Sequence, residues 1–405
     1  KLGAFKISMV EIMVVLMIVG FILRIRSQST DLALTGIDKL FLCLICWSLF
    51  SVHRAQNPIK TWQEVALLVE SFLIFYMVSH GLTKEDNKMV LLRSWCSGAV
   101  IVAALGILQF ILMLKTGQSF YGLDHGFLSH GLRINSTFSH ANSLSGYLIM
   151  FIPVLLAFSY KTTSNKRTFW LVSSAIVITA LVVTYTRTGW AATILALLLL
   201  IMLLKDKRLL IGLLACTILA SFMFPQVINR VESLLRPGTD LASLQRFQLW
   251  EAAYFMWRDN PIAGVGTGNF YNLLMTYAHR YPDLKQIFEP LEPHSSFIKF
   301  LAESGIVGLV LFIALISQIV RRAIKVYILE SETVHKIIFA GILSGGVAFL
   351  LQSNTNSLFH DPRVAVVFWM LAGLAAAEND KGKSVAEHRY PKAIPVVTGE
   401  NVVEI

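Results

Sequence analysis

Long apolar runs constrain the fold of this chain more than any other feature of its sequence. Several approach the roughly 20 residues that a helix needs to cross a bilayer. Candidate spans lie at about 7–23, 37–52, 62–80, 89–114, 142–160, 168–185, 189–204, 208–224, 297–320, 335–355 and 363–378. The chain is 55% hydrophobic and 15% charged, whereas soluble domains average about 25% charged residues. The sequence therefore predicts an all-α polytopic membrane protein with about 11–12 transmembrane helices.

The distribution of the net charge of +10 indicates how the chain is oriented. The basic connections "YKTTSNKR", "KDKR" and "RRAIK" and the tail 379–405 all fall on one side of the predicted spans. Basic loops stay in the cytoplasm, so we expect this side to be cytoplasmic, which also argues against nucleic acid as a partner. Counting back places Lys1 outside, so we expect a further span before it.

The longest connection on the opposite side covers residues 225–296. Within it, "LASLQRFQLWEAAYFMWR" has helical apolar spacing and ends before the stop signal at Asn260 and Pro261. This helix is expected to be amphipathic and to lie on the membrane surface. The following "GVGTGNF" has no preceding strand, so its glycines predict a tight turn and not a nucleotide-binding loop.

Arg187, in "TYTRTGW", sits at the joint between two apolar runs. An arginine is costly in hydrocarbon. Either it extends to the lipid headgroups as an anchor, or it faces water and binds something. The three threonines and the tyrosine around it would give a hydrogen-bonding environment that an anchor does not need.

Two further positions combine charge with an interfacial location. Arg246 and Trp250 share one face of the predicted loop helix. Arg246 is either a rim residue beside tryptophans or a planar fork that grips an oxyanion. His294 opens a span, with Ser295 and Ser296 as cap residues. The positive helix end disfavours a charged imidazole, so His294 is either a neutral general base or a polar boundary residue.

The stretch "RINSTFSHANSLSGY" is polar enough to be either a capped helix start or part of a site. In the second case Arg133 and His140 would reach a ligand. Glu289 and Glu292 lie near His294, but no further ligand has convincing spacing, so we expect no metal.

Acidic residues inside the apolar runs are the remaining unusual feature. Glu11, Glu64 and Glu70 give weak support for an ion pathway. Glu303 follows His294 by nine residues, half a turn out of phase on a helix, so we expect it to serve a neighbouring helix.

Taken in order, "TYTRTGWAA", "RFQLWEAAYFMWRDNPIAGVGTGNF" and "PHSSFIKFLAESGIVGLVLF" resemble the O-antigen ligase/polymerase superfamily. "NSTFSHANSLSGYL" is similar to the upstream motif of that family. The resemblance covers residues 133–312, and the flanking spans match by pattern only. It implies a GT-C-like glycosyltransferase fold with one large periplasmic loop, and a glycan on undecaprenyl diphosphate as the donor.

Carried over to this sequence, the resemblance implies that Arg187 and Arg246 bind the diphosphate and that His294 deprotonates the acceptor hydroxyl. Enzymes of this family invert the anomeric centre and need no metal or cofactor. Thr186 stands where the family often has serine, and Ser295 where it often has asparagine. Further candidate substrate-binding residues are Arg133, His140, Tyr185 and Trp250.

The expected organisation is a transmembrane glycosyltransferase domain (1–378) with a periplasmic loop (225–296) and a cytoplasmic tail (379–405), in the bacterial inner membrane. The favoured function is O-antigen ligation to lipid A-core in lipopolysaccharide biosynthesis. Alternatives are a polymerase that uses a second lipid-linked glycan as acceptor and a protein O-oligosaccharyltransferase. A lipid or glycan transporter would place polar residues near the bilayer midplane, whereas here they crowd one face.

Overall fold

The computed structural model describes residues 19, 34–82, 84–116, 133–160, 162, 164–208, 210–212, 214, 241–277 and 291–377. Within these residues the regular structure is helical, and no strand is present. Eight of the helices are long and apolar enough to cross a membrane. The prediction of an all-α polytopic membrane protein is thus confirmed. The predicted span 7–23, most of 208–224 and the tail 379–405 lie outside the described residues.

Every predicted span in the described part of the chain is a helix. The long apolar helices are α2 (Gly36–Phe50, extended by the 3-10 turn Ser51–Arg54), α3 (Pro58–Gly81), α4 (Glu85–Thr116), α6 (Ala141–Tyr160), α7 (Ser164–Val183), α8 (Arg187–Leu204), α13 (Ser296–Leu329) and α14 (Thr333–Ser353). A shorter apolar helix, α15 (Pro362–Ala376), follows them. Two further helices, α11 (Leu241–Asp259) and α12 (Phe270–Tyr277), precede α13.

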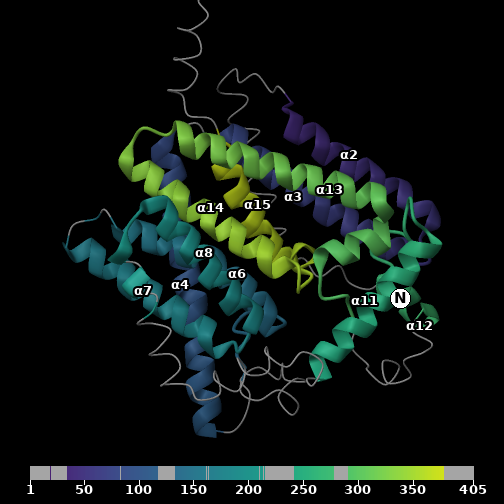
Figure 1. The fold of residues 1–405 in the computed structure, drawn as a ribbon, viewed down its shortest axis with the longest axis horizontal. Helices are drawn as coiled ribbons and strands as arrows, with labels where there is room; N and C mark the ends of the chain where they lie inside the picture. Colours follow the sequence, from purple (N-terminus) through teal and green to yellow (C-terminus); the bar gives the residue numbers. More distant parts are fainter. Residues whose placement is uncertain are drawn as a thin grey trace, which may run out of the picture.

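The helices pack in two groups, with α15 between them. Helix α6 packs against α7, α8 and α14, and α13 packs against α2 and α11. Figure 1 shows these groups on either side of α15, which contacts both α3 and α6. Helices α6 and α14 can approach closely because Gly345 has no side chain. A Cβ at this position would collide with the carbonyl oxygen of Met150. Small residues allow such close packing of membrane helices.

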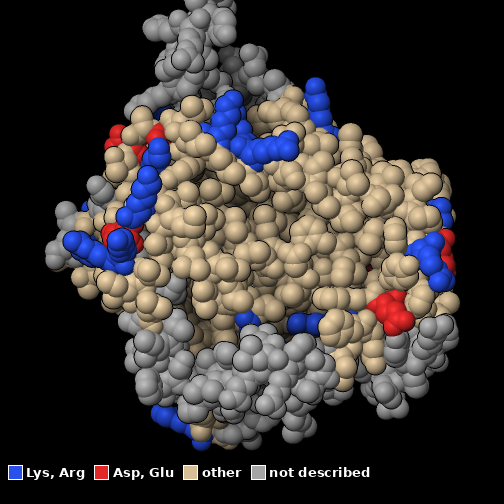
Figure 2. Space-filling view, in the orientation of Figure 1, with Lys and Arg blue, Asp and Glu red and all other residues tan. Residues whose placement is uncertain are grey.

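Charged residues lie mainly at the edges of the face in Figure 2, whereas its middle is almost free of them. An uncharged band of this kind is what a surface needs to lie in hydrocarbon. It agrees with the run of exposed apolar side chains along α4, among them Ile101, Leu105 and Leu108. In a bilayer these side chains would face lipid.

The expectation that "RRAIK" forms a loop is wrong, because α13 continues through it to Leu329. Arginine and lysine are good helix formers, and positive charge is favoured near the C-terminal end of a helix. Arg322 also gains a fixed partner there, since its Nε donates to the carbonyl oxygen of Ala376 at 3.2 Å. Helix α13 therefore extends beyond the end of its apolar run.

Helix α13 is broken at Gly305, whose φ of 65° and ψ of −169° are not helical. The segment that follows α11 inserts at this break. Val265 N donates to the carbonyl oxygen of Ala302 at 3.0 Å, and Ile306 N donates to that of Pro261 at 2.9 Å. These bonds replace the Ile306-to-Ala302 bond of a continuous helix. A break in the helical ladder thus ties the long connection to the bundle.

Glu303 secures the same segment through its side chain. Its two carboxylate oxygens accept the backbone N–H groups of Gly268 and Phe270, both at 2.9 Å. The second of these is the first residue of α12, where a negative charge is favourable. The expectation that Glu303 serves a neighbouring helix is confirmed, because its carboxylate accepts the first backbone N–H of α12.

The predicted tight turn in "GVGTGNF" is also confirmed, because Gly264, Gly266 and Gly268 all have positive φ. The turn packs against the connection between α2 and α3. Ser51 Oγ donates to Thr267 Oγ1 at 3.0 Å, and Thr61 Oγ1 donates to the carbonyl oxygen of Thr267 at 2.8 Å.

We predict that Gly264→Ala destabilises the protein. A Cβ there would collide with the backbone of Glu303, and the φ of +66° is unfavourable for alanine. The expected loss of unfolding free energy is about 2–5 kcal/mol, measured by thermal unfolding in detergent. Gly346→Ala is the control, because no atom lies within 4 Å of its Cβ position. Equal melting temperatures for Gly264→Ala and wild type would contradict the role of the turn.

Candidate functional site

Several helices begin at the same end of the bundle, and they carry the predicted motifs there. Asn356, which follows α14, links two of these helix starts. Its Nδ2 donates to Thr188 Oγ1 at 3.2 Å, next to Arg187. Its carbonyl oxygen accepts a hydrogen bond from Ser296 Oγ at 3.2 Å, two residues from His294. The starts of α8 and α13 are therefore held together, and Asn356 is a residue that the sequence analysis missed.

The turn that precedes α8 has an unusual backbone. Tyr185 has a φ of 50°, in the left-handed region that non-glycine residues rarely adopt. Its side chain is 6% exposed, and its ring meets that of Trp190 edge to face, with centroids 6.3 Å apart. Arg187, half-buried, is the first residue of α8. A positive end of a helix disfavours a cation and favours an anion, so an anionic ligand would suit this position.

Arg133 holds this turn in place. Its Nε donates to the carbonyl oxygen of Thr184 at 2.9 Å, and its Nη2 donates to Asn142 Oδ1 at 3.0 Å and Thr186 Oγ1 at 3.1 Å. The structure thus gives the guanidinium of Arg133 several partners inside the protein. These bonds explain how the left-handed turn is maintained, because strained backbone persists only where its surroundings fix it.

His294 lies at the start of α13 in a second left-handed turn, with a φ of 50°. Ser295 is the N-cap of the helix, and its Oγ accepts the backbone N–H of Ile298 at 3.3 Å. Trp250 fixes the residue before the histidine, since its Nε1 donates to the carbonyl oxygen of Pro293 at 2.6 Å. Helix α11 is thereby tied to the segment that carries His294.

The surroundings of His294 keep its imidazole neutral. Burial lowers its pKa from the ordinary value of 6.5 to about 4, assisted by the positive charge of Arg246 and by His140, while the carboxylate of Glu292 opposes the shift. At neutral pH the ring therefore has a lone pair available to accept a proton. The same interactions show that Arg246, His140 and Glu292 lie near the histidine.

The structure thus distributes the predicted residues over two parts of one end of the bundle. Arg246, His140 and Trp250 gather around His294, through electrostatic interaction or through contact with its segment. The remaining candidates lie at the start of α8, and they are Arg133, Tyr185 and Arg187.

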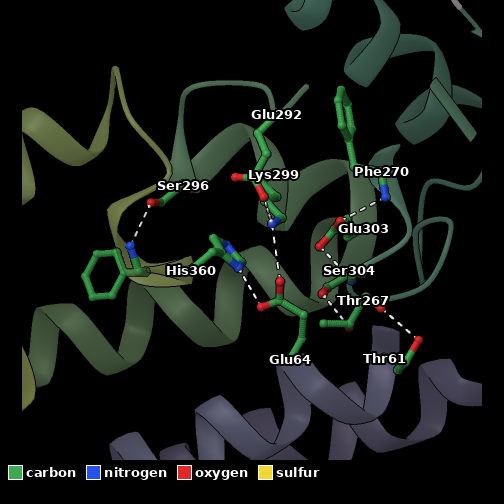
Figure 3. A network of polar contacts seen from close by, with 12 residues as sticks. Thr61, Glu64, Thr267, Phe270, Glu292, Ser296, Lys299, Glu303, Ser304 and His360 are labelled. Atoms are coloured by element: carbon green, nitrogen blue, oxygen red, sulfur yellow. Dashed lines mark hydrogen bonds and ion pairs between the residues drawn. The ribbon is translucent and has the colours of Figure 1, made fainter. Parts of the chain in front are cut away.

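Behind His294 lies a buried ionic network that sequence reasoning missed (Figure 3). Lys299, with 4% of its side chain exposed, donates to Glu292 Oε1 at 2.8 Å and to Glu64 Oε1 at 3.3 Å. His360 Nδ1 lies 2.8 Å from the other oxygen of Glu64. A signal for it was present, because Glu64 and Lys299 are opposite charges inside two different apolar runs. The ion pair with Lys299 accounts for the presence of Glu64 inside an apolar run, so an ion pathway is not needed to explain it.

Among the described residues, no group of three or more His, Cys, Asp or Glu side chains is arranged to hold a metal ion.

Residues 172–313 match the O-Antigen ligase family. A Rickettsia felis protein named "Putative polysaccharide ligase" is 22% identical over 308 residues, which cover 74% of this chain and 72% of that protein. A chain in a solved structure reported as "Structural coordination of polymerization and crosslinking by a peptidoglycan synthase complex" has 15% identity and a TM-score of 0.47, covering 88% of this chain and 98% of that one.

The fold is that of a multi-pass membrane protein, and the family match points to the class of glycosyl-transferring enzymes. The predicted resemblance is confirmed to this extent: residues 172–313 match the O-antigen ligase family.

We predict that Arg246→Ala raises the pKa of His294. The change removes a positive charge that opposes the imidazolium, so the ring should become protonated at a higher pH than in the wild type. The measurement is an NMR titration of ¹³C-labelled histidine, with the His294 signal assigned from its loss in His294→Asn. Arg258→Ala, at an exposed position of the same helix, should leave the titration unchanged. An unaltered midpoint in Arg246→Ala would exclude this electrostatic coupling.

Proposed function

We propose that this protein transfers a glycan from undecaprenyl diphosphate to an acceptor hydroxyl, with lipid A-core as the acceptor in lipopolysaccharide biosynthesis. The observation that carries the proposal is a half-buried, neutral histidine near Arg246, at the end of the bundle where α8 begins with Arg187. The match of residues 172–313 to the O-antigen ligase family supports glycosyl transfer, and the name of the Rickettsia felis relative supports a ligase.

The proposed reaction is a single displacement. The acceptor oxygen forms a bond to the anomeric carbon while the bond from that carbon to the diphosphate oxygen breaks, so the anomeric centre is inverted. The proton of the acceptor hydroxyl passes to the imidazole of His294. Negative charge grows on the leaving diphosphate, where Arg187, Arg246 and the N-terminal end of α8 would stabilise it. Because arginine is always charged and binds phosphate through two hydrogen bonds, the mechanism is proposed to be metal-independent.

Donor binding would also strengthen the base. The charge of Arg246 helps burial to hold the pKa of His294 at about 4. A bound diphosphate would offset that charge, and the pKa of His294 would rise towards the range in which a base works well at neutral pH. The histidine would then accept a proton most readily when there is a donor to react.

The distribution of charge supports a periplasmic site in the bacterial inner membrane. The basic connection after α8 begins at Lys205, the C-cap of that helix, whereas Arg187 lies at its other end. Basic connections remain in the cytoplasm, so the candidate site would face the periplasm. Lipid-linked glycan and lipid A-core are both membrane-anchored, which fits a site at the membrane surface with a GT-C-like arrangement.

We predict that Arg187→Ala and Arg246→Ala each lower glycan transfer about 100-fold or more and weaken donor binding. His294→Asn should lower transfer by roughly 100- to 10,000-fold while the donor still binds, because asparagine tolerates the left-handed backbone but is no base. Transfer is measured with purified protein, and donor binding by isothermal titration.

Arg258→Ala is the matched control for the two arginine variants and should retain wild-type transfer. Near-normal turnover in His294→Asn would remove His294 as the base. Unchanged donor binding in both Arg187→Ala and Arg246→Ala would overturn the diphosphate role.

A further inference from the structure

The buried ammonium of Lys299 has two carboxylate partners in the ionic network behind His294. Lys299 pairs with Glu64, which is 19% exposed and is also bound by His360. Lys299 pairs as well with Glu292, whose side chain is 40% exposed. A buried ammonium requires a counter-ion, and Glu64 already supplies one. Glu292 is therefore a second carboxylate, and it contacts Lys299 from the side opposite Glu64 (Figure 3).

Glu292 carries its negative charge in a fixed place. Burial alone would raise its pKa, but the charges of Lys299 and His360, together with the hydrogen bond from Lys299, hold the pKa below its usual value. Lys299 holds Oε1 at 2.8 Å. Among the described residues, no side chain or backbone group is recorded as a hydrogen-bond donor to the other oxygen. One carboxylate oxygen is thus anchored, and the other can accept hydrogen bonds.

The position of Glu292 relative to His294 is set by a short, stiff segment. Only Pro293 separates them, and the proline ring restricts the backbone. The carbonyl oxygen of Pro293 is held by Trp250 at 2.6 Å, and Ser295 caps the following helix. The carboxylate and the imidazole therefore lie on one segment that is fixed on both sides.

A fixed carboxylate repels a diphosphate, so Glu292 is unsuited to the donor. It is well suited to sugar hydroxyls, which donate short, charge-assisted hydrogen bonds to carboxylates. The site would then have two kinds of recognition around His294. Arginines from α8 and α11 would face the anionic donor, and a carboxylate on the histidine's own segment would face a hydroxyl-rich sugar of the acceptor.

We propose that Glu292 binds the acceptor sugar, taking a hydrogen bond from a hydroxyl next to the one that attacks the donor, and that it thereby presents the attacking hydroxyl to His294. Lys299 is a positioning residue that acts through Glu292. The inference rests on the proposed glycosyl transfer, and it identifies the acceptor as a sugar with neighbouring hydroxyl groups. Because Glu64 also pairs with the buried ammonium of Lys299 and 40% of the Glu292 side chain is exposed, removing the charge of Glu292 leaves Lys299 with a counter-ion, and the fold should stay intact.

The test compares wild type with Glu292→Gln in a transfer assay that uses undecaprenyl-diphosphate-linked glycan and lipid A-core. Glutamine keeps the shape of the side chain and removes its charge. The KM for lipid A-core should rise about 10- to 100-fold, the loss expected for a hydrogen bond to a charged group. The KM for the donor and the melting temperature should not change. Glu332→Gln, at an exposed carboxylate beyond the far end of α13, is the control and should behave as wild type.

Acceptors that lack single hydroxyl groups make the test specific. For the acceptor that lacks the hydroxyl group bound by Glu292, wild type and Glu292→Gln should have the same KM, because the partner of the carboxylate is already missing. An unchanged KM for lipid A-core in Glu292→Gln would overturn the inference. So would an equal rise in the KM for lipid A-core and the KM for the donor, together with a lower melting temperature. In either case, transfer by the wild type would still uphold the proposed function. Absence of transfer by the wild type would overturn both.

Discussion

The break in α13 at Gly305 is the constraint on which the rest of this end of the protein depends. A continuous helix would satisfy its own backbone groups and offer nothing to the connection from α11. Because the ladder opens, Ala302 and Ile306 bond to residues 261–265, and Glu303 holds the turn that follows. Residues 261–270, which lie between the predicted diphosphate arginine and the predicted base in the sequence, are thereby fixed to a membrane-spanning helix. A reaction with demanding geometry requires such fixed supports.

Helix direction adds a second, electrostatic constraint. Helices α6, α8, α13 and α15 begin at Ala141, Arg187, Ser296 and Pro362, and contacts between the segments before them place these starts at one end of the bundle. The N-terminal end of each helix carries partial positive charge. Together with the arginines, these ends would create a field that favours an anionic donor. The left-handed turns at Tyr185 and His294 occur in the same region, and strained backbone often accompanies function.

The local pattern of apolar and polar residues predicted much of this structure. It failed where the structure depends on contacts between residues far apart in the sequence. The apolar runs predicted the spans, the stop at Asn260 and Pro261 predicted the end of α11, and the motif order predicted the family. The partners of Lys299 were missed, because its contact with Glu64 joins residues 235 positions apart and no periodicity records such a pairing. The loop predicted at "RRAIK" was wrong because charge was read as the end of a helix.

The central claim is the transfer of a lipid-linked glycan to a separate acceptor. The most direct test is to incubate the purified protein with undecaprenyl-diphosphate-linked glycan, with lipid A-core in one sample and no added acceptor in the other. We expect a glycosylated lipid A-core in the first sample and unchanged donor in the second. A ladder of longer lipid-linked glycans without lipid A-core would instead indicate a polymerase, and absence of product in both samples would contradict the proposed glycan transfer.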